Sequence, residues 1–557
     1  MTTKNYLFGI LIFLSGVAFP IRAENTGTNP DLIQPVNADR NLIIDSIVID
    51  NRNIFDTNDP HYKHLIFRYA NKFHAITRQK VINRELLFKT GDVYPDELVE
   101  ETARNLRNRL SLYDAWIETD TLPDGKLIVR VVTIDEWSLS VGPNFSREGN
   151  KNQFELTITE RNLLGRNQYI SAGYFLKESE KDYENVHFID NKLWGKSFAL
   201  DLYHTSNPKN KTNWLILSKP FYHLNQRFSY YLSFNYADKD NEIYRDTLKI
   251  GSTASLGDEF DLWFSFRTGS YKNKIEYFTR FTYKYINSNG VNYFSEDPMD
   301  SMTVNSNIPN DTAYHLIDIG IKTSFLNFTK QKHIDGMGYI EDFNLGQVLS
   351  LSIGRAFKPD YNDYLYDIIT LNLWHGFSPG NNIIYIAYNR KHWFFNSSQL
   401  RKLSNMSLLF YNHSLDFVTL ALHSSYYSDW RADQSESLRF GGVNGIRGYN
   451  EYFKTGDRQM VINSEMRFFT GLEILAVKIG STIFVDAGRS WKADETINFR
   501  DFYFSAGVGL RFSIGHASRH KVMRVDFSFS EQNHWQISIG TEQYFHLSSE
   551  SFYLVSY

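Results

Sequence analysis

The chain has 557 residues, with 59 Lys and Arg against 63 Asp and Glu, so its formal net charge is −4. This balance does not favour a dedicated nucleic-acid-binding protein, which needs a basic face. Aromatic residues make up 16% of the chain although its mean hydropathy is only −0.40. That pairing excludes a bundle of apolar membrane helices and a disordered chain, and it favours a β-rich protein with one apolar face. Cysteine is absent, which excludes disulfides, thiolate metal sites and cysteine nucleophiles.

The first 23 residues predict a secretory signal peptide. Lys4 precedes the apolar stretch Tyr6 to Phe19, and the chain becomes polar after Ala23, where we expect cleavage. The apolar stretch is too short to span about 30 Å of hydrocarbon. Residues 24–41 are polar and predict a linker. We therefore expect an exported protein, and if it is embedded in a membrane we expect it to cross as a closed β-barrel.

Residues 42–136 predict a small α+β domain with the element order β-α-α-β-β. Leu98, Thr102, Leu106 and Leu110 repeat every four residues, as on one face of a helix. The expected elements are a strand at 42–50, helices at 77–88 and from Pro95 onward, and strands at 114–121 and 126–135. The stretch 52–76 lengthens the connection between the first strand and the first helix, and its role is open.

Residues 137–545 change to period-two alternation, which is typical of β-strands. Met523, Val525, Phe527 and Phe529 alternate with Arg524, Asp526, Ser528 and Ser530. Polar faces with charges opposite apolar faces with many aromatics indicate a barrel with lipid outside and water inside. At roughly 25 residues for each strand and its connection, we expect about sixteen antiparallel strands. A soluble sandwich or propeller is the alternative interpretation.

Two further segments are assigned within and after this barrel. Asn287 to Asp311 predicts a long outward loop, and residues 546–557 form a C-terminal tail beyond the last strand, which we expect at 536–545. The acidic residues of the loop, Glu296, Asp297 and Asp300, are interpreted as solvated rather than as a calcium site, because oxygen ligands at defined offsets are not evident.

Several motifs resemble the BamA/TamA family of outer-membrane assembly and secretion barrels. Residues 77–136 look like its POTRA module, and Glu160 to Arg166 (ERNLLGR) resembles a turn between early barrel strands. The segment Leu438 to Tyr449 resembles the family's inward-folded loop, with its motif at Ile446, Arg447, Gly448 and Tyr449. Phe484, Asp486 and Gly488 match the strand motif Phe-x-Asp-x-Gly. The resemblance implies an outer-membrane barrel of a Gram-negative bacterium with one POTRA module in the periplasm.

The arginine of the loop motif has a physical requirement of its own. A buried arginine needs a carboxylate, because removing one partner of a buried ion pair costs about 3 to 5 kcal/mol. Asp486 is the first candidate for the partner of Arg447 inside the lumen and Glu465 is the second. The alternative is a glycine-rich surface hairpin with a solvated arginine.

No enzyme signature is found, so we expect a protein without catalytic residues, metal or cofactor. The expected function is assembly: the POTRA module receives unfolded outer-membrane or secreted clients, and the barrel assists insertion among outer-membrane lipids, with no role for nucleic acid. The seam is expected between the first strand, marked by Trp137 and Gly142, and the last strand, marked by Gly540 and Phe545. The alternatives are a channel for one dedicated protein or for lipid, and a structural surface protein.

Overall fold

The computed structural model describes residues 42–546, apart from 124, 149–150, 178–182, 207–209, 246–247, 307–311, 362, 432–437, 443–444, 451–452, 516–521 and 533. The expected signal peptide (1–23) and linker (24–41) lie outside these residues, as does the expected tail (546–557) apart from His546.

The N-terminal module (residues 42–136) packs helices on a three-stranded sheet. Its strands have the order β1-β3-β2, with β1 parallel and β2 antiparallel to β3. Apolar side chains of α3 and α4 pack on the inner face of the sheet and form one core. The elements are β1 (Ile44–Arg52), η1 (Pro60–Tyr62), α2 (Leu65–Phe73), α3 (Gln79–Asn83), α4 (Asp96–Arg109), β2 (Leu112–Thr121) and β3 (Leu127–Asp135).

The helices of the module differ from the sequence prediction in two places. The helix expected at 77–88 is the short α3, because the chain leaves it to make tertiary contacts: Glu85 pairs with Lys192 of the barrel and the Leu87 amide donates to the Thr102 hydroxyl. The stretch 52–76 contains a helix that was not predicted, α2, which contributes only Phe67 to buried packing.

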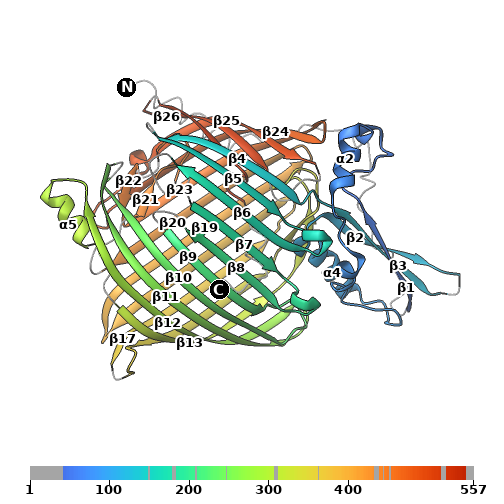
Figure 1. Cartoon of the computed structure of the whole chain (residues 1–557), viewed down its shortest axis with the longest axis horizontal. Helices are drawn as coiled ribbons and strands as arrows, with labels where there is room; N and C mark the ends of the chain where they lie inside the picture. Colours follow the sequence, from blue (N-terminus) through green and yellow to red (C-terminus); the bar gives the residue numbers. More distant parts are fainter. Residues whose placement is uncertain are drawn as a thin grey trace.

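The described residues from Leu139 to Gly540 form twenty barrel strands of one antiparallel sheet, and β27 and β4 are neighbours where the sheet closes. Figure 1 shows the strands tilted around the barrel, with the module at the right-hand end. The strands are β4 (Leu139–Glu148), β5 (Lys151–Glu160), β6 (Gln168–Lys177), β7 (Tyr183–Asp190), β8 (Ala199–Ser206), β9 (Asn210–Lys219), β10 (Phe228–Arg245), β11 (Leu248–Gly269), β12 (Asn273–Tyr293), β13 (Thr312–Phe325), β16 (Gln347–Phe357), β17 (Tyr364–Phe377), β18 (Asn382–Phe395), β19 (Ser398–Leu415), β20 (Val418–Arg431), β23 (Arg458–Ile474), β24 (Val477–Trp491), β25 (Tyr503–Ile514), β26 (Met523–Ser530) and β27 (Trp535–Gly540).

Side chains alternate between the two faces of this sheet, as the sequence predicted. On β26, Arg524, Asp526 and Ser528 are buried in the interior, whereas Met523, Phe527 and Phe529 are exposed on the outside. Large apolar side chains are exposed along most of the other strands as well. A barrel with an apolar outer surface and a polar interior is the architecture of transmembrane β-barrels, and this fold class is confirmed. Among the described residues, no helix has the length and apolarity needed to cross a bilayer.

Two details of the barrel correct the sequence prediction. The barrel has twenty strands in the described chain rather than about sixteen, because the early strands, β4 to β9, are only 8 to 10 residues long and follow one another through short turns. The last strand ends at Gly540 and not at Phe545, because residues 541–546 leave the wall and turn into the interior. Trp137 also precedes the first barrel strand instead of lying within it.

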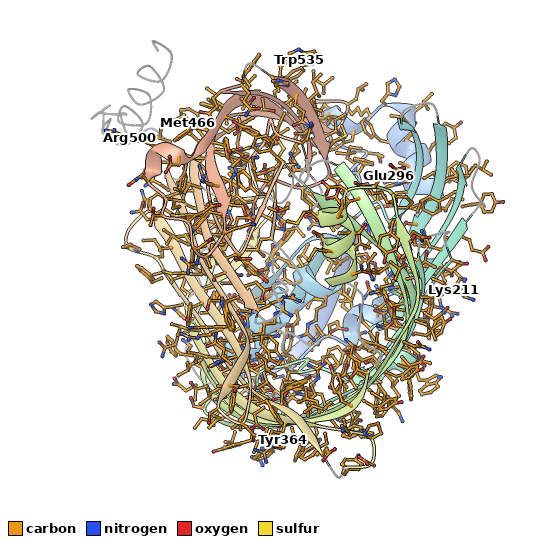
Figure 2. The ribbon with its side chains drawn as sticks, turned by 90° about the vertical axis from the view of Figure 1, so that its left-hand side faces the viewer. Lys211, Glu296, Tyr364, Met466, Arg500 and Trp535 are labelled. Atoms are coloured by element: carbon orange, nitrogen blue, oxygen red, sulfur yellow. The ribbon has the colours of Figure 1, made fainter. Side chains whose placement is uncertain are left out.

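Short 3-10 helices lie in the connections at η2 (Leu163–Gly165), η3 (Leu193–Gly195) and η5 (Phe499–Asp501), and three longer connections carry strands or an α-helix. The hairpin β14 (Phe328–Gln331) and β15 (Glu341–Asn344) lies at the module end, and the internal loop (residues 438–457) contains the short strands β21 (Leu438–Phe440) and β22 (Lys454–Gly456). The predicted outward loop 287–311 includes the end of β12 and the helix α5 (Pro298–Ser306), at the opposite end from the module. Figure 2 looks into the barrel from the α5 end, with the module visible behind the interior.

Helix α4 of the module lies across the mouth of the barrel. The Arg107 guanidinium donates from Nε and Nη2 to the Asp342 carboxylate of β15 at 2.8 and 2.5 Å, and from Nη1 to the Ala115 carbonyl at 2.7 Å. One oxygen of the Glu101 carboxylate accepts from the amide of Leu224, at 2.6 Å. Both side chains of the Arg107–Asp342 pair are almost fully buried. Polar contacts with little access to water therefore hold the module against the barrel.

We expect Arg107→Leu to loosen this contact, because it takes the guanidinium from a buried carboxylate at a cost of about 3 to 5 kcal/mol. The double variant Arg107→Leu/Asp342→Leu should recover part of the loss, since no buried charge is then left at either position. Hydrogen exchange of α4 amides in the detergent-solubilised protein is the measurement. Arg130→Leu, which breaks the exposed contact of Arg130 with Asp120, is the control and should leave exchange unchanged. Equal protection of α4 in all variants would contradict a docking role for Arg107.

Candidate functional site in the barrel interior

Charged side chains gather on the inner face of β23 to β26. Glu465 and Arg467 are two residues apart on β23, so both point inward, and Asp486 lies on the adjacent strand β24. Arg511 of β25 and Arg524 of β26 are cross-strand partners, and Asp526 faces inward two residues further along β26. All six side chains are buried. Period-two alternation on neighbouring strands thus builds one charged surface inside the barrel.

Arg447 reaches this surface from the internal loop. Its Nε and Nη2 donate to the two oxygens of Asp486, both at 2.8 Å, and its Nη1 donates to Glu465 at 2.6 Å. The same Nη1 lies 3.4 Å from Asp526. The guanidinium is also stacked between two rings, 3.5 Å from the centre of Phe484 and 4.2 Å from that of Tyr544. Only 1% of the Arg447 side chain is exposed, so its charge depends on these partners rather than on water.

The carboxylates around Arg447 are shared with three more arginines. Arg467 donates to Glu465 at 2.8 Å and to Asp335 at 2.7 Å. Arg511 and Arg524 donate to the two oxygens of Asp526 at 2.6 and 2.8 Å. In the described interior this arginine–carboxylate cluster therefore balances four arginines with four carboxylates: Arg447, Arg467, Arg511 and Arg524 with Asp335, Glu465, Asp486 and Asp526.

The residues around Arg447 explain how the loop can place this side chain against the inner wall. Gly448 has a φ of 84°, a left-handed conformation that glycine adopts without strain. Ile446 and Tyr449 on either side are buried with Phe440 and Val461, and the Tyr449 hydroxyl donates to the carbonyl of Phe504. A side chain at Gly488 would meet the Phe440 ring at about 2.9 Å, so the glycine of the strand motif leaves room for the loop.

The C-terminal segment (residues 541–546) completes the cluster from the module end. The Gln543 amide accepts from Arg511 and donates to the Asp335 carbonyl, and the Arg467 guanidinium donates to the Phe545 carbonyl at 2.7 Å. The Tyr544 hydroxyl lies 2.9 Å from the Gly442 carbonyl oxygen of the internal loop. The Phe545 ring is buried in an interior cluster with Ile334, Phe343 and Tyr411. The segment thus ties the end of β27 to both the loop and the wall.

The structure brings together most of the site residues that the sequence predicted. Ile446, Arg447, Gly448 and Tyr449 lie inside the barrel, and both candidate partners, Asp486 and Glu465, contact Arg447. Phe484 and Gly488 lie beside them. The seam residues do not share one place: Gly142 and Gly540 are in β4 and β27, whereas Trp137 packs near Ile54 of the module and Phe545 lies in the interior.

The sequence analysis did not assign five of the eight charged residues to the cluster, although the strand pattern placed some of them on the same inward face. Arg524 and Asp526 were already placed on the polar face of a predicted strand, and Arg467 shares its face with Glu465. Tyr544 and Gln543 had no such signal, because their inward turn depends on arginines far away in the sequence.

Glu341 of β15 is a buried carboxyl beside this cluster. It accepts hydrogen bonds from the backbone amides of Ile334, Asp335 and Gly336, at 2.9 to 3.1 Å. Burial, followed by the negative charge of Asp335, raises the pKa of Glu341 to about 7, although the three amides oppose the shift. Asp335 in turn contacts Arg467 and the Tyr411 hydroxyl.

The cluster holds separate segments of the chain together. Each of its carboxylates accepts from at least one arginine, which keeps them from serving as free bases. In the described part of the chain, no three His, Asp or Glu side chains are arranged to hold a metal ion. What the geometry can do is fix the internal loop and the C-terminal segment against the same stretch of wall.

We expect Arg447→Ala to lower the free energy of unfolding by about 3 to 5 kcal/mol, because Glu465, Asp486 and Asp526 lose a shared cation in a buried site. The matched control is Arg355→Ala, since Arg355 makes an exposed two-bonded pair with Asp367 and its loss should cost less than about 1 kcal/mol. Urea denaturation in detergent, read by heat-modifiable electrophoretic mobility, measures both.

Exchanging the charges by Arg447→Asp/Asp486→Arg should not restore stability, because an aspartate at 447 would face Glu465 and Asp526. Equal effects of the two alanine variants would contradict the role of the cluster.

We expect the hairpin around Glu341 to be less stable at pH 8 than at pH 5. The folded pKa of about 7 lies above the usual value of 4.5, so the folded state holds the proton more tightly than the unfolded state, and stability falls as pH rises through this range. Exchange rates of the Ile334 to Gly336 amides, corrected for intrinsic pH dependence, measure the change. Glu341→Gln should remove the pH dependence, and a dependence that persists in this variant would assign it to another group.

No protein-family model matches the chain, and no curated protein matches it. Among solved structures, it is similar to BamA from Haemophilus ducreyi lacking POTRA domains 1-3, with 11% identity and a TM-score of 0.39 over 90% of this chain and 83% of that one. It is similar to CdiB from Acinetobacter baumannii, with 11% identity and a TM-score of 0.40 over 90% and 73%. It is also similar to CdiB from Escherichia coli, with 11% identity and a TM-score of 0.44 over 93% of this chain and 92% of that one. The structural neighbours of the chain are thus BamA and CdiB, matched over about nine-tenths of its length.

Proposed function

We propose that this protein is an assembly factor in the outer membrane of a Gram-negative bacterium. Its N-terminal module, as a single POTRA domain in the periplasm, receives unfolded outer-membrane or secreted clients, and the barrel assists their insertion among outer-membrane lipids at the seam. The apolar outer surface and charged interior of the barrel support the membrane location. The motifs around Arg447 and Asp486 support the family resemblance on which the client class rests.

The observation that carries the proposal is the short strand at the seam. β27 has six residues, whereas its neighbour across the seam, β4, has ten and pairs with β5 over all of them. The closing strand is therefore shorter than the edge that it faces. Backbone N–H and C=O groups left unpaired within a bilayer are costly, and an exposed edge binds another extended chain through main-chain hydrogen bonds. A client strand can be received there with little dependence on its sequence.

The C-terminal segment explains why the closing strand is short. Residues 541–546 could have continued β27 along the wall, but Gln543, Tyr544 and Phe545 are held in the interior by the four cluster arginines. These residues thus make contacts inside the barrel instead of extending the strand at the seam.

Clients are expected to meet the module along its sheet. Both β1 and β2 are edge strands, because β3 lies between them. Addition of an extended peptide to such an edge uses the same main-chain hydrogen bonds as the seam. The module would then deliver to the barrel a chain that is already extended.

A channel for a dedicated protein or for lipid is the second candidate function. Such a channel needs a path through the barrel interior. Helix α4 covers the module end, and the internal loop is fixed across the interior by Arg447. A cavity of about 1000 Å³ lies next to α4, lined by Glu101 and Arg109 of that helix and by interior side chains of the wall such as Glu276 and Asp318. Transport through the interior therefore requires α4 and the loop to move, whereas insertion at the seam requires only the short strand to separate.

We expect a covalent lock across the seam to abolish insertion. Because the chain has no cysteine, double variants that combine Val141→Cys or Gly142→Cys with Ile539→Cys or Gly540→Cys can be oxidised without background. The measurement is insertion of a labelled barrel client into proteoliposomes that contain the full protein, with recovery on reduction. Val485→Cys/Ala506→Cys, which joins partners on β24 and β25, is the matched control and should leave insertion intact.

A second lock separates the two candidate functions. Glu100→Cys/Lys330→Cys, bridged by a bifunctional maleimide, joins α4 to β14 where the native side chains form an ion pair of 2.6 Å, and this bridge should hold the mouth closed. Insertion that survives this lock but not the seam lock supports the proposal. Activity that survives the seam lock and is lost with the mouth lock would contradict it and favour the channel.

A further inference from the structure

Helix α2 presents a contiguous apolar face that nothing in the described chain covers. Leu65, Ile66, Tyr69 and Phe73 are 61%, 59%, 55% and 76% exposed. At 100° per residue these positions share one side of the helix. The side chains of Tyr69 and Phe73 stack on each other with ring centres 6.4 Å apart. An exposed apolar face of this kind marks an interaction site, because isolated surface residues do not form one stripe.

The position of α2 puts this face beside the outer wall of the barrel. Phe67, on the opposite side of the helix, packs with Ile54, Phe55 and Ala476, and Ala476 belongs to the turn between β23 and β24. The Tyr62 hydroxyl donates to Glu473, near the end of β23, at 2.9 Å. Figure 1 shows α2 next to the module-side end of β24. The helix is therefore attached to the rim of the barrel and not to its mouth.

The rim at this end carries further exposed apolar side chains. Leu164, Trp194 and Leu475 each occupy a turn, each has a positive φ of 48° to 54°, and each is largely exposed, Trp194 to 83%. The turns of Leu164 and Trp194 contact the module through Arg78 and Arg84, so they lie at the module end. Bulky residues rarely adopt this strained backbone conformation. Apolar side chains held outward at one end of a transmembrane barrel mark the border between hydrocarbon and headgroups.

We propose that α2 is an interfacial helix whose apolar face inserts into the periplasmic leaflet of the membrane that surrounds the barrel. This inference rests on the proposed outer-membrane location. The face is continuous with the lipid-exposed barrel surface, because Ile474 at the end of β23 and Leu475 in the turn after it are exposed beside the residues that Phe67 and Tyr62 contact. An amphipathic helix with Leu, Phe and Tyr on one face lies in the plane of a membrane surface.

The charges of α2 fit a lipid surface that carries anionic headgroups. Arg68 and Lys72 are exposed three residues after Leu65 and Tyr69, so they flank the apolar face on one side. Lys63 and His64 are exposed just before the helix. Long basic side chains can keep their stems on the apolar surface while their charged ends reach phosphate groups. Membrane contact would thereby add to the protein contacts that already hold the module against the barrel.

Lipid quenching of single labelled cysteines tests the inference in the full-length protein. The protein is reconstituted in bilayers of phosphatidylethanolamine and phosphatidylglycerol, with a bimane label on Phe73→Cys and with lipids brominated close to the headgroup. We expect the label at 73 to lose most of its fluorescence when brominated lipid is present. Lys80→Cys, exposed on α3 of the same module, is the matched control and should keep its fluorescence. Ile319→Cys, exposed on the outer face of β13, reports whether the barrel is in the bilayer.

The outcomes separate this inference from the proposed function. If the label at residue 319 is quenched but the label at residue 73 is quenched no more than the label at residue 80, the inference about α2 is overturned and the proposed function is not. No quenching at 319 overturns the membrane location and with it the proposed function. Protection of residue 73 that rises with protein concentration in detergent, without lipid quenching, would assign the face to a second copy of the chain and also overturns the inference. A label on Ile66→Cys should lose its quenching when Tyr69→Asp/Phe73→Asp is added, since both sites are exposed and the fold does not depend on them.

Discussion

The interior of this barrel depends on the requirement that buried charges be paired. Arg447 is removed from water, and it is stable there only because Asp486, Glu465 and two aromatic rings surround it. Each of these carboxylates serves more than one donor or lies beside another arginine, so the position of the internal loop cannot change without disturbing the wall. The loop thus supplies a positive charge that pairs with the carboxylates of the wall.

The C-terminal segment links this interior charge pairing to the seam. The interior arginines bind the carbonyl of Phe545 and the side chain of Gln543, and the same residues are unavailable to lengthen β27. A closing strand of six residues next to an edge of ten is consequently a product of the interior cluster. The arginines that hold the internal loop and the wall together are thus also the ones that hold the C-terminal segment away from the seam. An insertion factor requires both a firm wall and one edge that can separate.

The sequence predicted the barrel, the three strands of the module and its helices α3 and α4, and it named Asp486 first and Glu465 second as candidate partners of Arg447. Alternation and the cost of a buried charge act locally, so they can be read from residues close to one another. The number of strands was wrong because turn lengths vary and period-two patterns do not report them. The inward turn of Phe545 and the helix at Leu65–Phe73 were not predicted. A terminal aromatic residue and a short amphipathic stretch do not by themselves indicate what they pack against in the folded chain.

The contacts of the C-terminal segment also have a consequence for how the chain reaches its native state. β27 and β4 are neighbours although they lie about 400 residues apart in sequence, and Gln543 joins Arg511 to the carbonyl of Asp335. Neither closure nor the contacts of Gln543 can form until the last strand has emerged, and pairings of such sequence separation form slowly. We expect the newly exported chain to pass through a period with unpaired strand edges and unpaired charges. A protein proposed to insert others is, by this topology, itself dependent on assistance while it folds.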